Sequence, residues 1–347
     1  MVATSHSSPE ERRARVIEWK AIVEIYQKPH LGRALWQVTN TFVSYAAVWW
    51  LLYLALDVSF WLVLPLVLLG AGLMVRVFII FHDCGHGSFF ASQRANDSLG
   101  FIAGLLTFTP YYQWRGEHAL HHRTTGDLDR RGVGDVWTMT VQEYLESSRW
   151  RRFAYRLARN PIVLFVIAPA FLFLVLQRFP SSGATGRERR SVWWMDLAIA
   201  GMVLVMGAIF GFVPYVVLHC SMMAIAGMWG VWLFYVQHQF EDAYWERGED
   251  WDYTEAALKG SSFYALPRVL QWFSGNIGFH HIHHLSPRIP NYYLEQAYKE
   301  NPELQNVVQL TIWDSLETAF LTLWDEREKR LVRFRDLKRL RPDAVKA

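Results

Sequence analysis

The sequence predicts an all-α integral membrane protein with four transmembrane helices arranged in two hairpins. Three observations carry this prediction. The chain of 347 residues is 52% hydrophobic. Its apolar residues are concentrated in runs that approach the length of about 20 residues needed to cross a bilayer. The breaks within two pairs of these runs are very short. We expect a single membrane domain with a helical cap on its cytosolic side.

Charge and cysteine content exclude several classes of protein. The formal net charge is only +3, so charge gives no indication of nucleic-acid binding. Cys84 and Cys220 are the two cysteines, too few for a disulfide framework or a cysteine-rich metal site. Residues 1–33 are polar and basic and lack the apolar core of a signal peptide, so we expect an uncleaved cytosolic arm that lies on the membrane.

The first hairpin is predicted at residues 34–81. Its two apolar spans, at about 35–56 and 60–81, are separated only by residues 57–59. So short a break places both outer ends on the same side of the membrane. Basic residues such as Arg76 flank those ends, and the positive-inside rule therefore places them in the cytosol.

Residues 82–193 are expected to form a cytosolic and interfacial part. Within it, the apolar segment 99–112 is too short to cross the bilayer. The longer apolar segment 161–176 has arginines on both sides, which argues against a crossing. We interpret both as membrane-embedded segments that do not span. The alternative is a protein with six spans.

The second hairpin is predicted at residues 194–237. Its spans, at about 194–213 and 215–236, meet near Pro214. Both outer ends again face the cytosol, so residues 238–347 form the cytosolic cap.

The cap is expected to contain an amphipathic helix, because five apolar residues recur there at helical spacing. These residues are Ile312, Leu316, Phe320, Leu323 and Trp324. The basic segment 327–339 that follows fits either a solvated helix face or a contact with anionic headgroups.

Three histidine clusters, at residues 82–86, 118–122 and 280–284, carry the candidate chemistry. Within each cluster, histidines spaced i, i+3 or i+4 share one face of a helix and can point at a common centre. They exceed the four ligands that a single zinc takes, so two metals with four or more nitrogens each fit better. The histidines concerned are His82, His86, His118, His121, His122, His280, His283 and His284.

Iron is the preferred metal on chemical grounds. Neutral imidazole suits iron, copper, nickel and zinc, but zinc has no redox chemistry. The Glu-x-x-His motifs of soluble di-iron bundles are missing, so an all-nitrogen iron pair is a separate solution. A lone histidine at a membrane boundary is more often structural, yet His238 follows the fourth span beside the other clusters, and we expect it to be a ninth ligand.

Other polar residues lie next to the clusters. Asn276 precedes His280 by four residues and is expected on the same helix face, either near a metal-bound water or as a cap. His281 points about a quarter-turn away from its neighbours, which suggests a supporting role. Asp83, Glu117 and Asp135 either accept the second ring N–H of ligating histidines or are solvated. Cys84 and His219 are interpreted as packing residues.

The sequence resembles the membrane fatty acid desaturases. The clusters HDCGH at 82–86, HALHH at 118–122 and HHIHH at 280–284 resemble the three histidine boxes of that family. The surrounding segments are similar to bacterial acyl-lipid desaturases of the delta-5 and delta-12 types over roughly residues 33–340. These segments are GDVW at 134–137, WLFYVQHQFED at 232–242, GSSFYALP at 260–267 and QWFSGNIGFHHIHHLSPRIPNY at 271–292.

The resemblance implies the activity and the participants. It implies two ferrous irons held by the eight box histidines and His238, with His281 at a position where an apolar residue is common. With O2 and two external electrons, the enzyme would introduce a cis double bond into saturated acyl chains of membrane phospholipids. The implied location is the bacterial inner membrane, with termini and active site in the cytosol.

The resemblance also implies a separate electron donor. Because no His-Pro-Gly-Gly stretch of a fused cytochrome b5 occurs, this donor would be a ferredoxin or flavodoxin. Arg115, Arg123 and Arg131 lie near the clusters and could receive an acidic donor.

Two alternatives to a desaturase remain at the level of the sequence. A hydroxylase or ketolase on the same di-iron scaffold would use the same ligands and differ only in substrate placement. A membrane metal transporter or sensor would carry its ligands within the spans. The spans here carry almost none, with His219 as the exception, which disfavours this second alternative.

Overall fold

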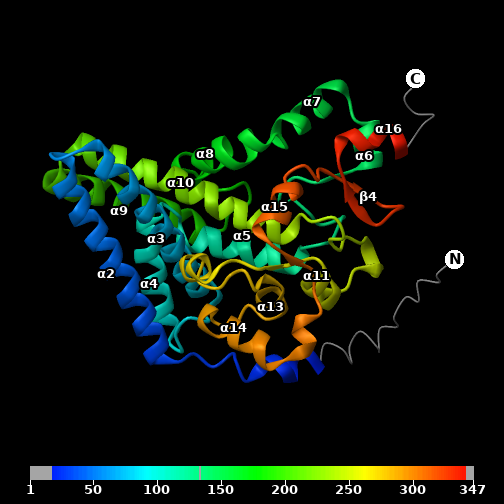
Figure 1. Cartoon of the computed structure of the whole chain (residues 1–347), viewed down its shortest axis with the longest axis horizontal. Coiled ribbons are helices and arrows are strands. Elements are labelled where there is room, and N and C mark those ends of the chain that lie inside the picture. Colours follow the sequence, from blue (N-terminus) through cyan, green and yellow to red (C-terminus); the bar gives the residue numbers. More distant parts are fainter. Residues whose placement is uncertain (1–17, 133, 341–347) are drawn as a thin grey trace.

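Four long helices form the membrane part of the computed structural model, which describes residues 18–132 and 134–340 (Figure 1). They are α2 (Leu31–Leu56), α3 (Phe60–His86), α9 (Gly186–Phe210) and α10 (Phe212–His238). Each is long and apolar enough to cross a membrane. The four predicted spans are therefore present as helices, and they follow one another in the two expected pairs.

Local capping explains where these helices begin and end. The Ser59 side chain accepts a hydrogen bond from the backbone N–H of Trp61 and starts α3. That helix runs without a break to His86 and ends at Gly87, whose φ of 67° suits glycine. As expected, the second transmembrane helix thus extends into the first histidine cluster.

The break in the second hairpin lies at Gly211, near Pro214 as predicted. Gly211 has a φ of 85°, which a residue with a Cβ rarely adopts. Pro214 lies in the first turn of α10, where a backbone N–H has no helical partner and its absence costs little.

The core of the bundle lies where α2, α3 and α10 meet. Trp49, Leu52, Met74 and Met222 are buried there in one apolar cluster. A Cβ on Gly70 of α3 would lie 2.3 Å from the sulfur of Met222, so a larger residue there would force the Met222 side chain to move.

Two apolar segments lie beside the four long helices. Helix α4 (Gln93–Leu106) is shorter than a span, as predicted for this region. Helix α7 (Arg149–Ala158) meets an apolar segment at 163–178 with a bend of 61°. This segment consists of a π-helical turn (Val163–Ile167), α8 (Ala168–Leu174) and a 3-10 turn (Leu176–Arg178).

The number of spans is four, or at most five if this bent pair crosses as a unit. The alternative of six spans therefore finds no support in the described residues. Whether segment 163–178 is embedded without crossing stays a prediction.

The described part of the N-terminal arm packs against the cap. Residues 18–24 are helical. Val23 and Tyr26 are buried against the cap, and the Tyr26 hydroxyl donates to Glu300 at 2.6 Å. Ile25 in the same part is 68% exposed, so whether the arm also lies on the membrane stays a prediction. Residues 1–17 and 341–347 lie outside the described chain.

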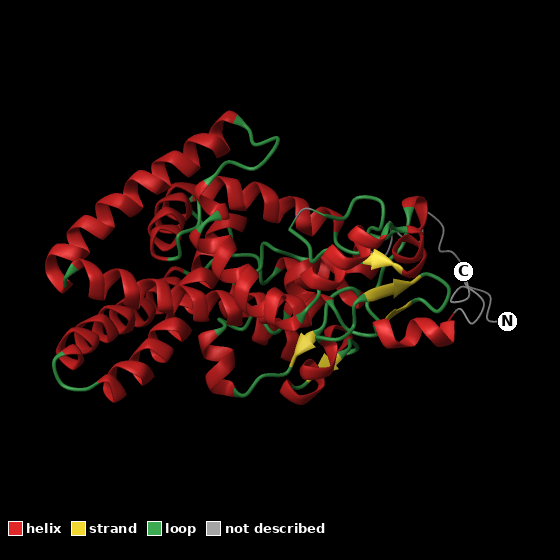
Figure 2. Cartoon of the chain, turned by 90° about the horizontal axis from the view of Figure 1, so that it is seen from above, coloured by secondary structure: helices red, strands yellow, loops and turns green. Residues whose placement is uncertain are grey.

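The cap consists of short helices and two small sheets. In the sheets, β1 (Met139–Thr140) pairs in parallel with β4 (Leu323–Asp325), which pairs antiparallel with β5 (Arg330–Val332), and β2 (Phe263–Tyr264) pairs in parallel with β3 (Gln309–Leu310). Figure 2 shows these strands at the cap end of the molecule. The all-α prediction therefore holds for the membrane part and is incomplete for the cap.

The short helices of the cap connect the sheets to the membrane part. They are α5 (Tyr111–Thr124), α6 (Val141–Glu146), α11 (Tyr253–Lys259), α12 (Arg268–Phe273), α13 (His280–Leu285), α14 (Asn291–Glu300), α15 (Ile312–Thr318) and α16 (Leu337–Leu340).

The predicted amphipathic helix across residues 312–324 is wrong. Helix α15 ends at Thr318, and Leu323 and Trp324 belong to strand β4, where both are fully buried. Leu316 and Phe320 are exposed. The helical spacing was misleading because the backbone of β4 pairs with β1, which is remote in sequence, and with β5, which follows it.

The basic segment that follows is largely paired within the protein. Lys329 pairs with Glu246, Arg330 with Glu241 and Arg333 with Glu317. These ion pairs favour a paired, solvated face over headgroup contact for this part of the segment.

We predict opposite responses for two nearby tryptophans. Trp324→Ala should destabilise the protein by about 3–5 kcal/mol, because it opens a cavity among Leu128, Trp245 and Leu331. Trp313→Ala should change stability by no more than about 0.5 kcal/mol, because Trp313 is 78% exposed. Thermal unfolding in detergent measures both. Equal losses would mean that 312–324 forms one buried helix after all.

Candidate metal centre

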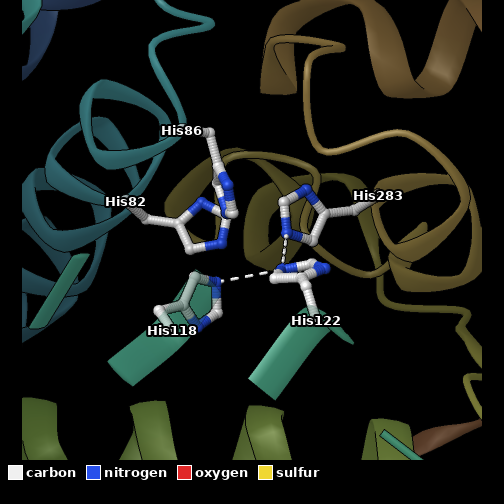
Figure 3. Close-up of side chains that lie close together, drawn as sticks. All are labelled: His82, His86, His118, His122 and His283. Atoms are coloured by element: carbon white, nitrogen blue, oxygen red, sulfur yellow. Dashed lines mark hydrogen bonds between the residues drawn. The ribbon is translucent and has the colours of Figure 1, made fainter. Parts of the chain in front are cut away.

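Nine buried or half-buried histidines converge where α3, α5, α10 and α13 meet. Five of them, drawn in Figure 3, have ligand atoms within 4.8 Å of one another, and so do three others. His280 joins the group of three, because its Nε2 lies 2.9 Å from Nε2 of His238. The first group is His82, His86, His118, His122 and His283; the second group is His121, His238, His280 and His284.

Helical spacing accounts for this division. His118 and His122 lie four residues apart on α5 and enter the first group, while His121 enters the second. Helix α13 likewise contributes histidines to both groups. The two groups are in contact with each other. The rings of His122 and His284 stack with their centroids 4.2 Å apart. The structure thus brings together all nine histidines that the sequence singled out.

Burial favours the neutral form of three imidazoles on α5 and α13. It lowers the pKa of His118 and His122 on α5 and of His283 on α13 well below the usual value, and the neighbouring histidines lower each pKa further. The neutral ring is the form that binds a metal. Nε2 of His86 and of His284 are buried without a hydrogen-bond partner, as expected of nitrogens with a lone pair free for a ligand.

Two carboxylates orient histidines of the site. One oxygen of Asp83 lies 3.0 Å from Nδ1 of His82, and one oxygen of Asp135 lies 2.6 Å from Nδ1 of His121. A carboxylate at Nδ1 favours the tautomer whose Nε2 faces the centre. Glu117 instead accepts a hydrogen bond from the Ser181 hydroxyl.

No pattern in the sequence indicated the residues that hold Asp83. Its other oxygen accepts hydrogen bonds from the backbone N–H and the side-chain amide of Asn291, at 2.6 and 2.8 Å. The side-chain amide of Gln37 in turn donates to Asn291 at 2.9 Å. These three residues come from α3, α14 and α2, so only the folded chain brings them together.

The second group is also held by backbone and side chains nearby. The carbonyl of Gly260 lies 3.1 Å from Nδ1 of His238 and accepts from it, since a carbonyl cannot donate. A small cavity beside this group is lined by Thr125, Asp135 and Gln239. The second oxygen of Asp135 is buried there without a partner.

Neither Asn276 nor His281 shares the helix face of the candidate ligands on α13. Asn276 lies in a turn between α12 and α13 with a φ of 60°, so it does not continue the helix of His280. His281 is fully buried, and its Nε2 donates to the carbonyl of Leu304 at 2.9 Å. Burial lowers the pKa of His281 to about 4. It anchors α13 to the cap from the side that faces away from the first group.

Cys84 and His219 are packing residues, as predicted. Cys84 is fully buried in an apolar cluster with Phe81 and Tyr111. His219 is buried within α10 and stacks on Phe108 with ring centroids 4.6 Å apart.

The arginines expected near a donor surface differ in availability. Arg123 is exposed, and Arg115 is about one-third exposed and pairs with Asp97. Arg131 pairs with Glu143 and is largely buried. The charge of Arg131 is therefore less available to an acidic partner than that of exposed Arg123, and a role of the three arginines in receiving a donor stays a prediction.

These features define a class: an integral membrane protein with a buried histidine site that can hold metal. The profile of the fatty acid desaturase family matches residues 59–314, which contain all three clusters. The chain belongs to the fatty acid desaturase family, whose members are oxidoreductases, and the family generally uses iron.

Relatives of this chain carry desaturase names. It is 46% identical to a fatty acid desaturase of Bacillus subtilis, over 92% of this chain and 90% of that protein. It is 29% identical to the sn-1 oleoyl-lipid 12-desaturase of Synechocystis, over 72% of each chain. It is 27% identical to the sn-1 acyl-lipid omega-3 desaturase (ferredoxin) of Synechocystis, over 70% of this chain and 68% of that protein.

We predict that substitutions of His283 and of His281 have different effects on the amount of bound iron. His283→Ala should remove about half of the bound iron, because it opens one of the two histidine groups. His281→Gln should keep the iron, because a side-chain amide can still donate to the carbonyl of Leu304. Elemental analysis after anaerobic loading with ferrous iron measures both variants. Equal iron in the two variants would contradict this division of roles.

Proposed function

We propose that this protein is an O2-dependent acyl-lipid desaturase that introduces a cis double bond into saturated acyl chains of membrane phospholipids. The single observation that carries this proposal is the pair of touching histidine groups at the ends of membrane helices. Such a site faces a substrate that is itself part of the bilayer.

Two ferrous irons fit the donor set. His82, His86, His118, His122 and His283 would hold one iron, and His121, His238, His280 and His284 the other. Ferrous ions held by neutral imidazoles would activate O2 for removal of two hydrogens from adjacent methylenes.

The residues around the site prepare it for an apolar substrate. Trp114 stacks on His118 with ring centroids 4.3 Å apart, and Phe234 lies 5.1 Å from the ring of His121. These rings exclude water beside both groups and offer an apolar surface to an acyl chain. Asp83 and Asp135 hold the imidazoles of His82 and His121 in fixed orientations. A chain bound in one register would present one pair of methylenes to the site.

The electron donor is proposed to be a soluble ferredoxin or flavodoxin. One relative is named for ferredoxin. Arg123, exposed directly after His122, and Arg115 offer positive charge close to the site.

The proposed location is the bacterial inner membrane, with the cap and the histidine site in the cytosol. Arginines at the start of α9, at positions 187, 189 and 190, are exposed and support this orientation by the positive-inside rule.

The activity is tested by expression in a host rich in saturated phospholipids, with a working ferredoxin system. Mass spectrometry of the acyl chains should show a new double bond that disappears in His284→Ala. His281→Gln is the matched control and should keep activity. Unchanged lipids despite two bound irons would refute the proposal, and a mono-hydroxylated product would assign the hydroxylase alternative.

The topology is tested by a tag inserted at 183–188, in the exposed loop before α9 and its first turn. We expect a label that cannot cross the membrane to reach this tag only from the cytosolic side. Labelling from the periplasm would show that segment 163–178 crosses.

A further inference from the structure

Helix α7 turns an apolar stripe away from the protein. Its ten residues include Tyr155, which is fully buried, and Trp150, Phe153 and Leu157, which are 81%, 59% and 51% exposed. At 100° per residue the three exposed positions form one stripe on the side of the helix away from Tyr155. Figure 1 shows α7 at the outer edge of the molecule, beyond α8.

Three arginines of α7 have no acidic partner in the described chain; Arg149 lies beside the stripe, and Arg151 and Arg152 lie nearer the side of Tyr155. Arg149, Arg151 and Arg152 form no ion pair in the part of the chain that the structure describes. Some other exposed arginines are paired, as Arg247 is with Asp129 and Glu326. Positive charge on α7 is therefore available to an outside partner.

We propose that α7 docks on an anionic lipid surface. Trp150, Phe153 and Leu157 enter the boundary between headgroups and acyl chains, and Arg149 beside them contacts lipid phosphates. Arg151 and Arg152 add positive charge within a Debye length of the lipid surface. Interfacial helices combine an aromatic and aliphatic face with basic flanks in this way. Charge complementarity thus selects an anionic membrane as the occupant.

The chain that follows α7 supports this choice over an acidic protein. After the bend of 61°, segment 163–178 exposes apolar side chains such as Ile167 and Phe171, which are 56% and 51% exposed. A helix set at this angle to a membrane-embedded segment can lie along the bilayer surface. An acidic electron donor would leave Trp150, Phe153 and Leu157 without an apolar partner.

The docked helix is fixed to the metal centre through Arg159, which ends α7 and is almost fully buried. One nitrogen of its guanidinium donates to Gln239 at 3.1 Å, to the Tyr235 hydroxyl at 3.0 Å and to the Leu321 carbonyl at 2.6 Å. Gln239 directly follows His238. Docking of α7 therefore holds the second histidine group at a set height above the lipid surface. This consequence rests on the proposed function, whereas docking itself does not.

Hydrogen–deuterium exchange of the full-length protein in nanodiscs tests the docking. Residues 149–158 should exchange more slowly in discs of phosphatidylcholine with phosphatidylglycerol than in phosphatidylcholine alone, and added salt should reduce the difference. The variant Arg149→Gln/Arg151→Gln/Arg152→Gln should lose this protection. Each arginine near an anionic surface contributes roughly fivefold, so the docking equilibrium should fall about a hundredfold.

The matched control is Arg335→Gln/Lys338→Gln/Arg339→Gln, which removes three positive charges from exposed residues close to the C-terminal end of the described chain. It should keep the protection of α7. Equal exchange in neutral and anionic discs, or equal loss in both triple variants, would overturn the proposal. Protection that appears only with added ferredoxin would assign α7 to the electron donor instead. The measurement needs neither iron nor turnover, so its failure is distinguishable from failure of the proposed activity.

Discussion

The structure depends on the burial of nine imidazoles in one place. The rings pack against one another, and burial lowers the pKa of His118, His122 and His283 because it disfavours their charged form. The same burial leaves nitrogen lone pairs without partners, which costs free energy until a metal binds. A metal bound here would couple stability to metal affinity, since it would provide the interactions that the buried nitrogens lack.

Four helices bring the nine histidines together at the same level of the molecule. Helix α3 carries His82 and His86 beyond its apolar run, and α10 ends at His238. Helices α5 and α13 approach from the cap. Because α5 and α13 each supply both histidine groups, the two groups cannot move independently. The proposed reaction at two adjacent methylenes of one chain would benefit from such a fixed arrangement.

A second set of buried polar contacts ties the membrane part to the cap. Asp83 is held by Asn291, and Gln37 holds Asn291 in turn. On the other side, Arg159 connects α7 with Gln239 and the carbonyl of Leu321. Breaking one partner of such a contact leaves a buried polar group unsatisfied, which costs more than the net gain from an ordinary hydrogen bond. These contacts explain how a cap of short elements holds a fixed position over the bundle.

By itself, the sequence determined the four long helices, their pairing and the nine histidines. Those features follow from local rules: the length of an apolar run and the repeat of an α-helix. The sequence misplaced Leu323 and Trp324, whose strand pairs with β1 more than 180 residues earlier. It also gave no sign of Asn291, Gln37 or the division of the histidines into groups of five and four. Only the tertiary structure decided these, because each depends on contacts between segments whose spacing along the chain carries no periodic signal.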